Sequence, residues 1–142
     1  MKRKLIFTVL TLILLSGSFF HDTSAEQPVS IKAVLFFSPS CPVCHVVMEE
    51  ILPPLSNQYG DQLEIVGIDV SIPAGQELYR ATVSAFSVPG DRLGVPTIVI
   101  GNSVLVGRYE IEDQLPQLIK SGLAANGIDW PANRRKTSKK EK

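Results

Sequence analysis

The sequence is poor in metal-binding side chains and has no net charge. Among its 142 residues there are only two cysteines, two methionines and two histidines. A structural zinc site needs four ligands, and after residue 25 the chain has only three cysteine and histidine side chains, Cys41, Cys44 and His45. The 14 basic and 14 acidic side chains cancel, which argues against a protein that binds polyanions. We therefore expect no metal site and no nucleic-acid partner.

The zero net charge is the sum of three unlike segments. Residues 1–25 have a net charge of +2, residues 26–133 hold 5 basic and 12 acidic side chains, and residues 134–142 have a net charge of +5. A hydrophobic content of 44% with 20% charged residues is ordinary for a globular protein, and the length suits one domain. Residues 134–142 contain no apolar side chain. We predict a single folded domain over 26–133, followed by a basic disordered tail.

The first 25 residues have the pattern of a secretory signal peptide. Three cations, Lys2 to Lys4, precede an uncharged apolar run, and small residues end the segment at Ala25. The alternative is an uncleaved membrane anchor, but the stretch 5–20 is shorter than the roughly 20 residues that a spanning helix needs. No cysteine lies near the cleavage site, which excludes lipidation there. We predict export to the periplasm or another extracytoplasmic compartment.

Hydrophobic patterning predicts an α/β domain. The predicted elements are, in order, a strand at 31–37, a helix at 42–59, a strand at 63–70, a helix at 76–86, a hairpin of strands at 97–100 and 104–106, and a helix at 111–126. Pro53 and Pro54 must kink or interrupt the first helix, because neither has a backbone N–H to donate. Pro116 is expected near the first turn of the last helix, where proline is tolerated.

The two cysteines form one motif, Cys41-Pro42-Val43-Cys44, between the first strand and the first helix. A disulfide across two residues stabilises little, because the entropic gain grows with loop length. Two sulfurs at the start of a helix can instead join or separate with little backbone movement. The helix N-terminus also stabilises a thiolate. We therefore predict that Cys41 is the nucleophile and Cys44 the more buried resolving thiol, with Pro42 and Val43 modulating the pair.

Residues 36–44, together with Val95-Pro96-Thr97 some fifty residues later, resemble the thioredoxin superfamily. The likeness is greatest to small exported thioredoxin-like disulfide oxidoreductases, and it covers roughly residues 29–126. The resemblance implies a thioredoxin-like three-layer fold with a central mixed β-sheet flanked by helices. It also implies that Pro96 is cis and lies against the cysteine pair, and that the backbone of Val95 binds the substrate.

The resemblance further implies a function. We expect an extracytoplasmic thiol–disulfide oxidoreductase whose redox-active Cys41–Cys44 disulfide takes the place of any metal or organic cofactor. Its partners would be thiol-bearing substrate proteins and a membrane-bound redox partner. Two positions depart from thioredoxin itself: its buried aspartate would fall at Leu35, and the lysine beside it near Ile65. Without that carboxylate, oxidation or isomerisation is favoured over fast general reduction, although the direction of electron flow stays open at this point.

Two other functions use the same residues. Cys41 to His45 matches the CxxCH pattern of c-type haem attachment. The only methionine after residue 25 is Met48, and the other histidine is His21 in the predicted signal, so a second axial ligand is hard to find. The main alternative is binding or delivery of a soft metal such as Cu(I) by Cys41 and Cys44, with His45 as a third ligand. His45 is otherwise either a cation that modulates Cys41 or an ordinary exposed helix residue.

Overall fold

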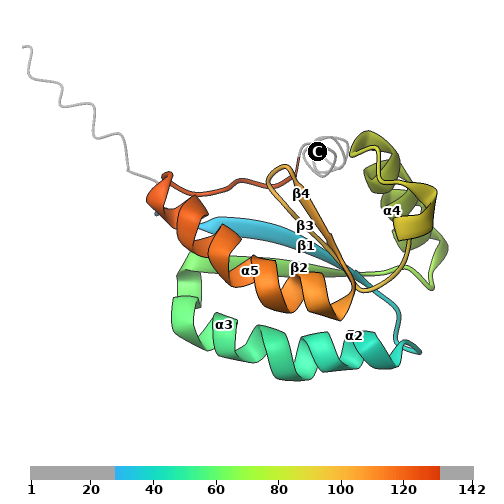
Figure 1. Cartoon of the computed structure of the whole chain (residues 1–142), viewed down its shortest axis with the longest axis horizontal. Helices are drawn as coiled ribbons and strands as arrows, with labels where there is room; N and C mark the ends of the chain where they lie inside the picture. Colours follow the sequence, from blue (N-terminus) through green and yellow to red (C-terminus); the bar gives the residue numbers. More distant parts are fainter. Residues whose placement is uncertain (1–27, 132–142) are drawn as a thin grey trace, which may run out of the picture.

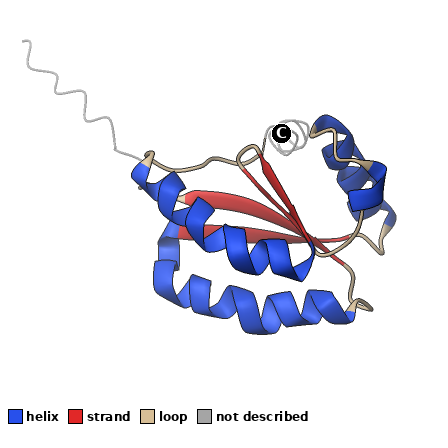
Figure 2. Ribbon diagram, in the orientation of Figure 1, coloured by secondary structure: helices blue, strands red, loops and turns tan. Residues whose placement is uncertain are grey.

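The computed structural model describes residues 28–131, which form a small α/β domain (Figures 1 and 2). Its elements are β1 (Ile31–Phe37), α2 (Pro42–Val46), the π-helical turn η1 (Val47–Ile51), α3 (Leu52–Tyr59), the short η2 (Gly60–Gln62), β2 (Leu63–Asp69), α4 (Pro73–Ala85), the short η3 (Gly90–Arg92), β3 (Thr97–Ile100), β4 (Ser103–Val106) and α5 (Gly107–Ala124). The predicted order of strands and helices is confirmed.

The predicted signal peptide and basic tail lie outside the described residues. In the part that the structure describes, no helix combines the length and the apolar character needed to cross a bilayer.

The four strands make one mixed sheet in the order β2-β1-β3-β4. Strand β1 is parallel to β2 and antiparallel to β3, and β3 and β4 form the predicted hairpin. Beyond the end of β3, the segment after α5 continues the pairing: the Ile128 amide donates to the Ser30 carbonyl at 2.9 Å, and the Lys32 amide donates to the Ile128 carbonyl at 2.8 Å. Strand β1 is therefore flanked on both sides along its length, which suits its nearly continuous apolar sequence.

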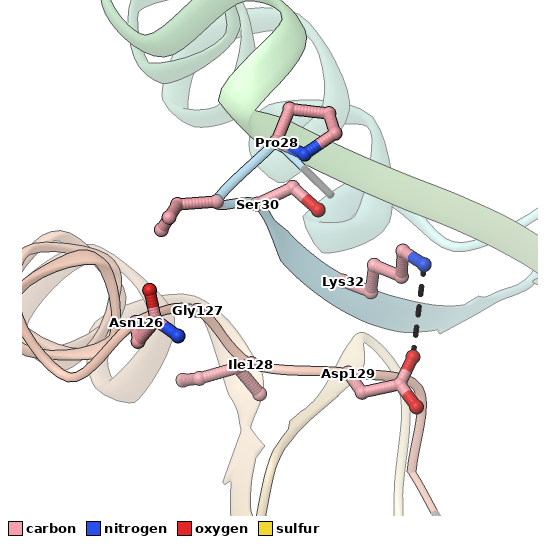
Figure 3. Close-up of a pocket in the computed structure, with 8 residues that line it drawn as sticks. Pro28, Ser30, Lys32, Asn126, Gly127, Ile128 and Asp129 are labelled. Atoms are coloured by element: carbon pink, nitrogen blue, oxygen red, sulfur yellow. Dashed lines mark ion pairs between the residues drawn. The ribbon is translucent and has the colours of Figure 1, made fainter. Parts of the chain in front are cut away.

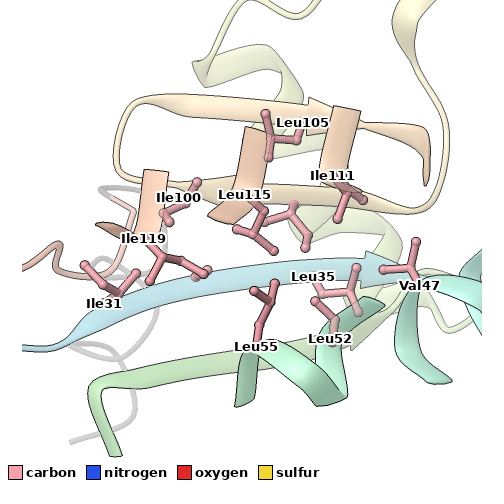
Figure 4. Close-up of a cluster of buried hydrophobic side chains, with 12 residues drawn as sticks. Ile31, Leu35, Val47, Leu52, Leu55, Ile100, Leu105, Ile111, Leu115 and Ile119 are labelled. Carbon is pink, nitrogen blue, oxygen red and sulfur yellow. The ribbon is translucent and has the colours of Figure 1, made fainter. Parts of the chain in front are cut away.

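Helices cover both faces of this sheet (Figure 1). One buried cluster joins β1, β3 and β4 to α3, η1 and α5, and its residues Ile31, Leu35, Val47, Leu55 and Leu115 are among those drawn in Figure 4. The other cluster, centred on Val34, Phe36 and Val99, packs against α4. Alternate side chains of β1 enter opposite clusters, as the two-residue period of a strand requires. The expected fold class, a three-layer α/β arrangement with a thioredoxin-like layout, is confirmed.

The helix after the cysteines changes its hydrogen-bond pattern just before its two prolines. At η1 the Leu52 amide donates to the carbonyl of Val47, which is the i→i+5 spacing of a π turn. Pro53 and Pro54 have no N–H, so they cannot serve the carbonyls one α-turn earlier. The interruption expected from the sequence is therefore confirmed as a local π turn, after which α3 runs to Tyr59 and stops at Gly60 (φ 50°).

Two helices begin earlier in the structure than the sequence predicted. Helix α4 begins at Pro73, three residues before the predicted start, and uses this proline in its first turn. Helix α5 begins at Gly107, so Pro116 lies inside the helix and not near its first turn as expected. Proline at 116 removes the donor for the Glu112 carbonyl, but Glu112 is on the exposed side of the helix, where water can replace the missing bond.

Candidate functional site

Cys41 is the N-cap residue of α2. Its backbone is extended (φ −92°, ψ 109°), and its Sγ accepts a hydrogen bond from the Cys44 amide at 3.2 Å. Its own amide donates to the Ser38 carbonyl at 3.0 Å. The N-cap position places the sulfur among backbone donors that have no partner within the helix. The sequence-based placement of Cys41 at the start of the helix is therefore confirmed.

Cys44 lies one turn into the helix and is fully buried, whereas Cys41 is partly exposed, and both thiols are free. Burial raises the pKa of the Cys44 thiol to about 11, and a hydrogen bond and electrostatic repulsion from the neighbouring Cys41 sulfur add to the rise. At neutral pH the buried thiol is therefore protonated. The predicted difference in exposure between the two sulfurs is confirmed.

The loop before β3 meets the cysteines from the other side. The Val95 carbonyl oxygen lies 3.7 Å from the Cys41 Sγ, and the Val95–Pro96 peptide bond is cis, as the resemblance implied. Pro96 is buried, and its carbonyl accepts from the Gly107 amide at 2.8 Å. This proximity arises because Phe36 at the end of β1 pairs with Thr97 at the start of β3. The contact of Cys41 with Val95 thus brings the two predicted parts of the site, the cysteine motif and the loop with the cis-proline, together at one end of the sheet.

The two residues between the cysteines lie at the surface. Pro42 occupies the first position of α2, where its missing N–H costs no hydrogen bond. Val43 is exposed to 44%, an unusual degree for a large apolar side chain in this domain. A molecule that approaches the Cys41 sulfur therefore meets an apolar side chain next to it.

Both ring nitrogens of His45 contact groups other than the two cysteines. Its Nε2 lies 2.8 Å from the Pro39 carbonyl oxygen and its Nδ1 lies 3.2 Å from Glu49 Oε1. Both contacts raise the pKa of the imidazole above 6.5, the Pro39 carbonyl first and the Glu49 carboxylate second, because only the imidazolium can donate to both oxygens. Since both ring nitrogens are engaged, His45 is not oriented as a third ligand beside Cys41 and Cys44.

Tyr79 of α4 also contributes to the site, although no sequence pattern indicated this residue. Its hydroxyl donates to the Gly94 carbonyl at 3.0 Å and accepts from the Gly94 amide at 2.9 Å. In the sequence, Tyr79 stands among the apolar residues of an amphipathic helix, where it is typical of a core residue. No local pattern marks its contact with the loop before Pro96, because that contact depends on how α4 packs on the sheet.

Two other features lie apart from the cysteines. Between residues 28 and 131, no three His, Cys, Asp or Glu side chains gather closely enough to hold a metal ion. A hollow of about 600 Å³ is lined by residues 28–30, Lys32 and residues 126–129 (Figure 3). It lies where β1 begins, whereas Cys41 follows the end of that strand, so the hollow is separate from the cysteine site. The charges of Lys32 and Asp129 are paired there at 3.6 Å.

Comparison with known proteins supplies likeness to solved structures but no named family. No model of a known protein family matches the chain, and no curated protein matches it. A solved structure described as "Structure of a malarial protein" matches with a TM-score of 0.43 and 21% sequence identity, covering 65% of this chain and 96% of that chain. The function is therefore inferred from the geometry around the two cysteines.

Proposed function

We propose that this protein is an extracytoplasmic thiol–disulfide oxidoreductase of the thioredoxin superfamily, which exchanges disulfides with thiol-bearing proteins. The observation that carries the proposal is the position of the Cys41 sulfur. It is partly exposed at a helix N-cap, it lies 3.2 Å from the Cys44 amide and 3.7 Å from the Val95 carbonyl, and a buried second thiol follows one turn later. The signal-like pattern of residues 1–25 supports action outside the cytoplasm.

The exchange proceeds in two steps. The Cys41 thiolate attacks one sulfur of a substrate disulfide; a new sulfur–sulfur bond forms, the substrate bond breaks, and the departing thiolate takes a proton from water. Cys44 then loses its proton and attacks the Cys41 sulfur. The Cys41–Cys44 disulfide forms, the bond to the substrate breaks, and the substrate leaves with both sulfurs reduced. The same steps in reverse oxidise a substrate dithiol, and a membrane-bound redox partner restores the starting state.

The environment of Cys44 bears on the direction of exchange. Its pKa of about 11 makes it a poor nucleophile until a base removes its proton. Leu35, at the position where thioredoxin has a buried acid, is 3% exposed and packs in an apolar cluster with Val47. Among residues 28–131, no carboxylate acts on the Cys44 thiol, which supports oxidation or isomerisation as the physiological direction over fast reduction.

Trapping of mixed disulfides tests the proposal. We expect Cys44→Ala to accumulate an adduct on Cys41 when mixed with a peptide disulfide, because the resolving thiol is missing. Cys41→Ser should give no adduct and no exchange, and both outcomes are read by intact-mass spectrometry. The proposal fails if Cys44→Ala forms no adduct or if Cys41→Ser retains exchange activity.

Equilibration with a glutathione buffer measures the reduction potential of the Cys41–Cys44 pair and so tests the direction of electron flow. A potential near the value of about −270 mV for thioredoxin would contradict a role as an oxidant.

A further inference from the structure

The ring of Tyr79 is held in one orientation between α4 and the sheet. It packs edge-to-face on Phe36 of β1, with ring centroids 5.4 Å apart and an angle of 66° between the planes. Phe36 is itself only 1% exposed, so the surface against which Tyr79 rests is fixed. The ring therefore directs its hydroxyl at one place, the loop between η3 and β3.

At that place the hydroxyl binds both backbone groups of one residue. It donates to the Gly94 carbonyl at 3.0 Å and accepts from the Gly94 amide at 2.9 Å. The Gly94 carbonyl also accepts from the Thr97 hydroxyl at 2.6 Å. A hydroxyl carries one donor and acceptor lone pairs, so Tyr79 satisfies both polar groups of Gly94 at once.

The backbone N–H and C=O groups next to Gly94 differ in whether they already have hydrogen-bond partners. Proline 96 has no N–H, and its carbonyl is bound by the Gly107 amide at 2.8 Å. Within residues 28–131, no hydrogen bond engages the Val95 amide, and the Val95 carbonyl accepts only from the Cys41 thiol at 3.7 Å. Val95 thus offers an incoming extended chain its amide and, once Cys41 has lost its proton, its carbonyl as well.

We infer that Tyr79 is a positioning residue for polypeptide substrates: its hydroxyl holds Gly94 so that the Val95 backbone stands at a fixed place beside Cys41. This inference rests on the proposed function. An extended substrate that pairs with Val95 needs the amide and carbonyl in a defined register, and the loop has no strand of its own to supply one. A small disulfide that reacts at Cys41 without pairing has no such requirement.

Tyr79→Phe tests this assignment, because it removes the hydroxyl and keeps the ring on Phe36. We expect the KM for an extended peptide disulfide to rise about tenfold. The kcat, and the rates at which Cys41 reacts with hydroxyethyl disulfide and with iodoacetamide, should change less than twofold. Hydrogen exchange at the Gly94 amide should accelerate in the variant. Tyr59→Phe is the matched control, since this partly buried tyrosine has no hydroxyl hydrogen bond among the described residues.

Thr97→Val is a second variant, which removes the other hydroxyl on the Gly94 carbonyl. We expect a smaller rise in KM, again confined to the peptide, and a Gly94 amide that stays protected. If Tyr79→Phe does not fold, Thr97→Val provides the test through the same comparison of peptide with small disulfide. An unchanged KM for the peptide then overturns the assignment. With Tyr79→Phe, an unchanged KM or an equal loss with peptide and small disulfide overturns it. If the wild-type protein shows no exchange activity, both the proposed function and the inference fail. The wild-type assay alone therefore separates this outcome from a failure of the inference about Tyr79.

Discussion

The sulfur of Cys41 lies 3.7 Å from the carbonyl oxygen of Val95, although 54 residues separate the two in the sequence. The antiparallel pairing of β1 with β3 produces this contact, because it sets Phe36 opposite Thr97 and so carries both flanking loops to the same edge. A partly exposed cysteine sulfur next to a backbone amide that has no partner among the described residues suits the polypeptide substrate that we propose.

The buried thiol should react far more slowly than the exposed one. In Cys41→Ser only Cys44 remains, and burial, the largest cause of its raised pKa, is retained. In the wild type, with a Cys44 pKa of about 11, about one molecule in ten thousand carries the Cys44 thiolate at pH 7. Loss of the Cys41 sulfur removes two smaller causes of the raised pKa, and burial still disfavours the Cys44 thiolate. We expect iodoacetamide to alkylate Cys41→Ser at least about a hundredfold more slowly than Cys44→Ala at pH 7, with the rate still rising at pH 10. Equal rates at neutral pH, measured by mass spectrometry, would contradict the assignment.

The imidazole of His45 should titrate above 6.5. Donation to Pro39 and to Glu49 favours the protonated ring, so Glu49→Gln should lower the pKa without returning it fully to 6.5. Because the folded-state pKa is the higher one, the stabilisation from these bonds is fully present below the unfolded value. It is lost as pH rises through the folded value. Proton NMR of the His45 ring over pH 5–9 measures the shift, and a pKa at or below 6.5 in the wild type would refute it.

The ion pair between Arg92 and Glu110 should stabilise the loop before β3 more than an ordinary surface pair does. Arg92 Nη2 donates to both carboxylate oxygens of Glu110 at 2.8 and 2.7 Å, and the Val106 amide also donates to Oε2 at 2.9 Å. Glu110→Ala should lower the free energy of unfolding by about 1 kcal/mol, allowing for partial exposure. The matched variant Glu112→Ala breaks the single contact to Arg108 at 3.3 Å and should cost about 0.3 kcal/mol.

Urea denaturation of both variants decides this prediction. If Glu110→Ala and Glu112→Ala lose the same stability, the double contact and the bond to the Val106 amide contribute nothing beyond a surface pair.

Gly75 should tolerate no larger residue. A Cβ added at this position of α4 would overlap the backbone carbonyl of Asp69 at the end of β2, so the helix would have to move away from the sheet. We expect Gly75→Ala to lower the free energy of unfolding by about 3 kcal/mol, at the upper end of overpacking costs. Gly90→Ala is the control, because nothing lies within 4 Å of an added Cβ there. Chemical denaturation measures both, and equal losses would contradict the close approach.

The local features of this protein follow from its sequence. Strand β1 has the predicted bounds, Ile31–Phe37, because its β-branched and aromatic side chains favour extended backbone and burial on both faces. Cys41 as N-cap and Pro42 in the first turn follow from rules that involve only neighbouring residues. Boundaries that depend on packing were predicted less well, since α5 begins at Gly107. Pro116 stands inside α5 because the helix bond that it removes is on the exposed side, where water can replace it.

The completed candidate site depends on the tertiary structure. The identities of Val95 and Pro96 as site residues came from a resemblance. The distance from Val95 to Cys41 is set by the β1–β3 register, which joins segments 54 residues apart. The hydroxyl of Tyr79 on Gly94 has no signal in the sequence, since a tyrosine on an apolar helix face is equally typical of a core. Sequence patterns report interactions between near neighbours. The docking of α4 and the pairing of the strands decide which distant backbone groups a side chain can reach.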